Sequence, residues 1–101
     1  MGVKKEKEHP QGITPRTRTH YTKLLEELQP YTQNHILLSY LIRNRSITPD
    51  EAWNKLGIYR LSGRICDLRG KGVEITTLRI PVPDRFGDTK YVAKYVLDEV
   101  V

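Results

Sequence analysis

The chain has 101 residues, 38% of them hydrophobic, which is enough for one small domain with a modest core but not for two. Seventeen Lys and Arg against twelve Asp and Glu give a net charge of +5, which favours a polyanionic partner because neutralised phosphates release counterions. No apolar run approaches the roughly 18 residues that span a bilayer, so we expect a soluble, cytoplasmic protein that does not bind membranes. The single cysteine, Cys66, excludes an internal disulfide and a cysteine-rich zinc site.

Residues 1–19 have few apolar side chains and several prolines and glycines, so they are predicted to form a flexible basic arm. Such an arm could follow a phosphate backbone or simply be a solvated terminus. Residues 20–31 are predicted to be a short helix and linker, because apolar residues recur at helical spacing from Tyr21 to Leu28 and Pro30 stops the pattern. This helix could pack on the main domain or serve in dimerisation.

Thr32 is a suitable N-cap for a longer helix that runs to about Asn44 and buries a stripe around Leu37 and Leu41. Thr48-Pro49-Asp50-Glu51 then has the pattern of a capping box and opens a short helix that ends at Leu56. Gly57 is predicted to take the left-handed conformation after that helix.

A third helix is expected from Tyr59 to about Arg69, because Leu61, Ile65 and Leu68 fall on one face. Residues 73–80 and 91–97 then have strand-like patterns, separated by a loop over 81–89 that is too long for a tight hairpin. This order predicts an α+β fold: a winged helix-turn-helix domain over residues 32–101, with a three-helix core and a β-hairpin wing.

In this architecture the third helix, residues 59–69, enters the major groove of duplex DNA and the wing, residues 80–90, contacts the backbone. Arg60 is the first candidate for reading a base, since a guanidinium can bond guanine bidentately. Phe86 is expected at the tip of the wing. The complete predicted DNA-binding set is Tyr59, Arg60, Ser62, Gly63, Arg64, Arg69, Lys71, Arg79, Arg85 and Lys90.

Several of these residues also have structural interpretations. Arg64 could pair with Glu51 across two helices, and Asp67 is expected to bond a neighbouring arginine or a turn amide because it would repel phosphate. Cys66 is expected to be a small, semi-buried filler, and Gly63 could serve helix packing alone.

The segment from Ser46 to Ala52, the glycine turn, and the run Arg60-Leu61-Ser62-Gly63-Arg64-Ile65-Cys66-Asp67-Leu68-Arg69 resemble a family of small winged helix-turn-helix proteins common in bacteriophages and prophages. The hairpin ending in residues 92–97 is part of the same resemblance, which covers about two thirds of the chain. The resemblance implies a DNA-binding fold and a phage or bacterial origin, with the bacterial host cell as its location. Cys66 stands where an aromatic residue is often found.

Two other classes of function compare differently with the sequence. An enzyme is not expected, because the three histidines lack metal-ligand spacing and no nucleophile motif or phosphate-binding glycine loop is present; no cofactor or metal is predicted. The stronger alternative to a duplex-DNA regulator is a phage-encoded inhibitor that uses a winged-helix scaffold to bind a host protein or an RNA-protein defence complex, of the anti-CRISPR type. A homodimer would suit a regulator, because one winged helix reads few base pairs.

Overall fold

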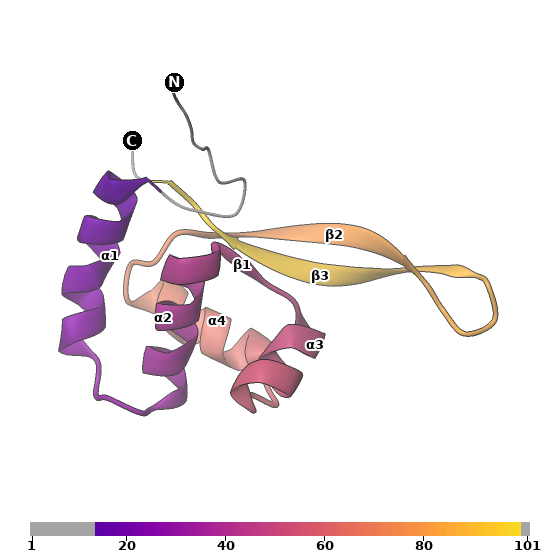
Figure 1. The fold of residues 1–101 in the computed structure, drawn as a ribbon, viewed down its shortest axis with the longest axis horizontal. Helices are drawn as coiled ribbons and strands as arrows, with labels where there is room; N and C mark the ends of the chain where they lie inside the picture. Colours follow the sequence, from indigo (N-terminus) through magenta and orange to yellow (C-terminus); the bar gives the residue numbers. More distant parts are fainter. Residues whose placement is uncertain (1–13, 100–101) are drawn as a thin grey trace, which may run out of the picture.

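The computed structural model describes residues 14–99, which form a cluster of helices and a small sheet (Figure 1). Within residues 14–99, no helix combines the length and apolar content that a membrane crossing requires. This architecture confirms the expected α+β class. The elements in chain order are α1 (Pro15–Glu27), α2 (Gln33–Asn44), β1 (Ser46–Ile47), α3 (Pro49–Glu51), its π-helical continuation η2 (Ala52–Leu56), α4 (Leu61–Gly70), β2 (Ile75–Pro83) and β3 (Thr89–Leu97).

The core lies where α2, α4 and the base of the hairpin meet, with α1 on its outer side. Thr32 caps α2 by accepting a hydrogen bond from the His35 amide, and α2 buries nearly its whole inner face, as its apolar pattern predicts. Helix α4 contributes Leu61, Ile65 and Leu68, which its helical spacing places on one side. The buried apolar residues are Tyr21, Leu37, Leu38, Tyr40, Leu41, Ile42, Ile47, Ala52, Ile58, Leu61, Ile65, Leu68, Val73, Ile75 and Leu97.

Helix α1 begins at Pro15, so the predicted start near His20 was wrong. Proline suits a first helical turn, and the Thr14 side chain accepts a hydrogen bond from the Thr17 amide. Residues 15–19 therefore belong to a helix and not to a basic arm; residues 1–13 of the expected arm lie outside the described residues.

Of the two roles left open for this helix, the structure shows that it packs on the main domain. Tyr21 is 1% exposed, and its hydroxyl accepts a hydrogen bond of 3.1 Å from the Glu74 amide, which ties α1 to the chain between α4 and β2. Burial of this ring raises the pKa of Tyr21.

The sheet is three-stranded and antiparallel, in the order β1-β3-β2. Strand β1 was not expected: Ser46 pairs with Val96 and Ile47 with Tyr95, so the link between two helices also closes one side of the sheet. The hairpin is also longer than predicted, because pairing continues to Pro83 opposite Thr89. Proline is tolerated there because β2 is an edge strand, whose outward amides need no partner strand.

Arg45 ends α2 with a positive φ of 73°, a conformation that favours glycine. Tertiary contacts hold it there. Its carbonyl accepts a hydrogen bond of 2.7 Å from the Leu97 amide, and its guanidinium lies 3.5 Å from the Glu99 carboxylate. The end of α2 is thus joined to the end of β3.

Glu99 connects three parts of the fold. Its Oε1 accepts hydrogen bonds from the Thr14 amide and hydroxyl and, at 2.7 Å, from the Thr17 hydroxyl, while Oε2 faces Arg45. Burial alone would raise the pKa of Glu99, but the hydrogen bonds from Thr17 and Thr14, aided by Arg45, outweigh it and hold the pKa below its ordinary value of 4.5.

We therefore expect Glu99→Gln to lower the free energy of unfolding at pH 7 by about 1 kcal/mol, since it removes charge-assisted hydrogen bonds. The lowered folded pKa means that the contribution of this carboxylate is complete above 4.5 and is lost as the pH falls through the folded value. Urea unfolding at pH 7 and at about pH 3 should show the difference between wild type and variant shrinking in acid. Exposed Glu26→Gln is the control, and an equal difference at both pH values would contradict the role of the charge.

Candidate nucleic-acid interface

Two short helical segments and α4 form a helix-turn-helix. The capping box at Thr48 is complete: its side chain accepts a hydrogen bond from the Glu51 amide, and the Glu51 carboxylate accepts one from the Thr48 amide. Gly57 has a φ of 69°, as predicted, and the Ile58 amide then donates to the Ala52 carbonyl at 2.9 Å. This turn buries Ile58 and points the chain into α4.

Helix α4 begins at Leu61, two residues later than predicted. Arg60 is its N-cap, with a φ of −113° and a ψ of 71°, and Tyr59 belongs to the turn. Tyr59 and Arg60 lie just before the helix because they form the end of the turn that buries Ile58. The predicted inward face is confirmed, because Leu61, Ile65 and Leu68 are buried.

The residues around the start of α4 form an exposed surface. Tyr59 is 81% exposed, and Arg60 and Ser62 are also exposed. The Arg60 side chain forms no hydrogen bond or ion pair with any residue from 14 to 99. A Cβ built on Gly63 would meet no described atom within 4 Å, so internal packing does not explain this glycine. The surface here leaves room for another molecule to approach the backbone.

Farther along α4, two predicted contact residues have partners inside the protein. Arg64 lies 3.4 Å from Asp67, so the expected link of Asp67 to a neighbouring arginine is confirmed, and Arg64 pairs with it instead of Glu51. The Arg69 guanidinium donates two hydrogen bonds to the Ile75 carbonyl, at 3.1 and 2.7 Å, and one to the Thr77 hydroxyl. Arg69 thus fastens the helix to β2.

Two further predicted positions lie just after α4 and within it. Lys71 is exposed just after α4. Cys66 is exposed, so its expected role as a semi-buried filler was wrong. The core face of the helix is taken by positions 61, 65 and 68, and a residue next to position 65 points about 100° away from it.

The wing ends in a turn over residues 84–88 that Asp84 organises. Its carboxylate accepts hydrogen bonds from the Phe86 and Asp88 amides at 2.8 and 3.0 Å, and Gly87 has a φ of 86°. Asp84 therefore shapes the turn at the tip of the wing. Arg85 and Phe86 are left exposed at the tip, Phe86 by 81%.

The register separates the other two predicted wing contacts. Arg79 lies opposite Ala93, whereas Lys90 lies opposite Val82. Because side chains alternate along a strand and directly paired residues share a face, these two cations lie on opposite faces of the ribbon. Figure 1 shows the ribbon extending well beyond the helices, so its tip can reach a surface that the helices do not.

Comparison with models of known protein families gives a match for this chain. The model of a winged helix-turn-helix domain matches residues 32–100, more than half of the chain. The chain belongs to this winged helix-turn-helix family. Comparisons with curated proteins and with solved structures give no match. A winged helix-turn-helix domain indicates nucleic-acid binding.

The family match includes the whole winged helix-turn-helix, with the start of α4 and the wing, and leaves out α1. Helix α1 therefore lies outside the matched residues, although it contributes Tyr21 to the core. The outer face of α1 is basic, because Arg16, His20 and Lys23 recur at helical spacing around a shallow hollow.

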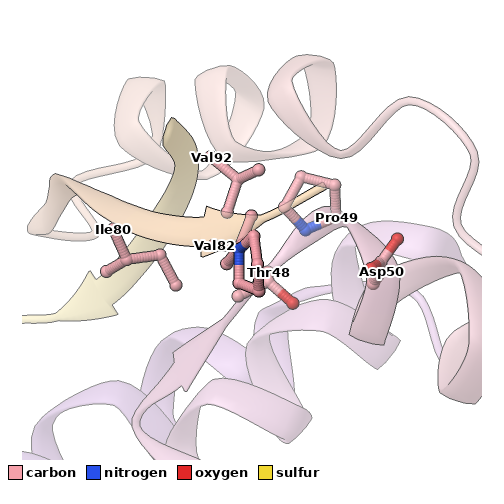
Figure 2. Close-up of a pocket in the computed structure, with 7 residues that line it drawn as sticks. Thr48, Pro49, Asp50, Ile80, Val82 and Val92 are labelled. Atoms are coloured by element: carbon pink, nitrogen blue, oxygen red, sulfur yellow. The ribbon is translucent and has the colours of Figure 1, made fainter. Parts of the chain in front are cut away.

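A pocket of about 290 Å³ lies between the start of α3 and the wing (Figure 2). Ile80, Val82 and Val92 of the wing line it, together with Pro49. Its charged lining residue is Asp50, which would repel phosphate. This pocket is thus unsuited to a nucleic-acid backbone.

One feature of the winged domain was missed in the sequence. Trp53 lies in the same short helical segment as the buried Ala52 but is 56% exposed, and its ring meets Tyr59 edge to face with centroids 5.4 Å apart. The sequence around Trp53 could have indicated its exposure. The neighbouring residues Asn54 and Lys55 are polar, and Ala52 is the buried residue of this short helical turn.

Proposed function

We propose that this winged helix-turn-helix domain is a sequence-specific regulator that binds duplex DNA, with the start of α4 in the major groove and the wing turn on the backbone. The observation that carries the proposal is the exposed side chain of Arg60 at the N-cap of α4, which has no hydrogen-bond or ion-pair partner among residues 14–99. The first residues of a recognition helix are those that reach base edges, and the major groove admits a helix.

We assign different roles to the proposed DNA-binding residues according to whether their side chains already bond other residues of the protein. Tyr59, Arg60, Ser62 and Gly63 form the surface proposed to approach base edges. Arg64 and Arg69 are engaged by Asp67 and by β2, so we assign them to orienting α4 and, through any remaining donors, to phosphate. The proposed phosphate contacts outside the helix are Lys71, Arg85 and whichever of Arg79 and Lys90 faces the duplex.

The experiment that tests this function is selection of bound duplexes from a random library with the full chain, followed by electrophoretic shift titration of the enriched sequence. We expect enrichment of a defined motif and tighter binding of that motif than of a scrambled duplex. Enrichment without a motif would reject sequence specificity. Failure to bind any duplex would reject the proposal and favour the inhibitor alternative.

Arg85→Ala is expected to weaken binding of the selected and scrambled duplexes to a similar extent, because a phosphate contact at the wing tip carries no base information. It should also reduce the slope of log affinity against log salt by about 0.9, the value for one phosphate contact in B-DNA. Titration at several salt concentrations measures both effects. The control is Arg18→Ala, which removes the same charge from exposed α1; an unchanged slope for Arg85→Ala would contradict the wing contact.

A further inference from the structure

The pair Trp53–Tyr59, here called the aromatic pair, is a large apolar surface left open to solvent beside the helix-turn-helix. The exposed fractions are 56% for Trp53 and 81% for Tyr59, although each ring would gain from burial. The two rings lie edge to face, at an interplanar angle of 65°. The contact between them orders both side chains while their outer surfaces stay accessible.

The local backbone explains how the pair is formed. Trp53 lies in the π-helical segment η2, whose widened turn directs Ala52 into the core. The Trp53 carbonyl accepts a hydrogen bond from the Gly57 amide, and the turn that follows brings Tyr59 back against the indole. No neighbour among residues 14–99 buries the pair, so folding alone does not account for two exposed aromatic rings.

The aromatic pair is continuous with the proposed interface. Tyr59 directly precedes Arg60, the N-cap of α4 and the residue proposed to read a base. A duplex that approaches Arg60 therefore also approaches the exposed ring of Tyr59 and the Trp53 ring in contact with it.

We propose that the aromatic pair packs against the 5-methyl group of thymine beside the base pair that Arg60 contacts, so that it selects an A·T pair at that position. This inference rests on the proposed function. The thymine methyl is the apolar group that base pairs display in the major groove, and aromatic side chains contact it favourably. Phosphates would instead call for cations, and the aromatic pair carries no charge.

The test removes only the methyl group. In the selected duplex, each thymine is replaced in turn by uracil, which keeps every hydrogen bond of the base pair. Wild-type protein should lose about fourfold in affinity at one position, the effect expected for one buried methyl group. Trp53→Ala should bind the thymine duplex less tightly and show no further loss with uracil. The matched control is Phe86→Ala, an exposed aromatic at the wing tip, which should keep the full response to uracil.

A second measurement needs no variant. Trp53 is the single tryptophan of the chain, so its fluorescence reports on this surface alone. Its emission should change on binding of the thymine duplex. A wild-type protein that binds the selected duplex with no uracil-sensitive position overturns the thymine contact, and unchanged Trp53 emission overturns the location. Failure to bind any duplex would instead overturn the proposed function.

Discussion

Arg60→Ala is expected to weaken binding of the selected duplex by about 1–3 kcal/mol and to relax the preference at one base pair, most clearly at a guanine. The guanidinium has five donors in a planar fork, and in the free protein none of them is engaged by a described residue. Binding would therefore break no hydrogen bond or ion pair between the Arg60 side chain and residues 14–99. The measurement is a repeat of the duplex selection with the variant, together with titration of the original sequence.

Two controls make this result specific. Arg60→Lys keeps the charge but loses the bidentate geometry, so we expect it to recover part of the affinity and little of the base preference. Arg64→Ala removes an arginine of the same helix that is already paired with Asp67. An unchanged selected motif for Arg60→Ala, with affinity lowered equally for all duplexes, would reassign Arg60 to phosphate.

Leu68→Ala is expected to lower the free energy of unfolding by about 2–5 kcal/mol, because the side chain is fully buried and alanine leaves a cavity. Leu68 belongs to the last turns of α4, next to the residue that fastens this helix to β2. A loss of that size is a large share of the roughly 5–15 kcal/mol that stabilises a small domain. Urea unfolding followed by circular dichroism measures it.

Cys66→Ala is the matched control, since position 66 is on the same helix but exposed. We expect a change within about 0.5 kcal/mol, as for most surface substitutions. Equal destabilisation by the two variants would show that α4 packs differently from the structure described above. The two variants also serve as references for the binding experiments. A variant that loses DNA binding but is as stable as Cys66→Ala has lost a contact, whereas one destabilised like Leu68→Ala has lost its fold.

Elements defined within a few residues of chain could be predicted from the sequence. The capping box at Thr48, the N-cap at Thr32 and the left-handed Gly57 each depend on groups no more than a few positions apart. The buried stripe of α4 follows from helical geometry alone. These local signals were sufficient for the order of helices and for the α+β class.

Elements that depend on distant partners could not be predicted in the same way. Strand β1 is two residues long and exists because Ser46 and Ile47 meet β3, about fifty positions later. Pro81 and Pro83 indicated a loop, yet they extend the hairpin because β2 is an edge strand. The start of α1 at Pro15 is supported by Glu99, at the other end of the described chain.

The candidate site divides in the same manner. The sequence by itself determined that an arginine-bearing helix follows a glycine turn, because spacing and capping are local properties. Tertiary structure decided that Arg69, which bonds β2, is engaged inside the protein, while Arg60 stays unengaged among the described residues. The pairing of Arg64 with Asp67, three positions later in the same helix, is local. Tertiary structure also left Trp53 outside the core, since Ala52 and Ile58 fill the space beneath the turn. Local chemistry thus determines which groups exist along a helix, and packing determines which of them another molecule can reach.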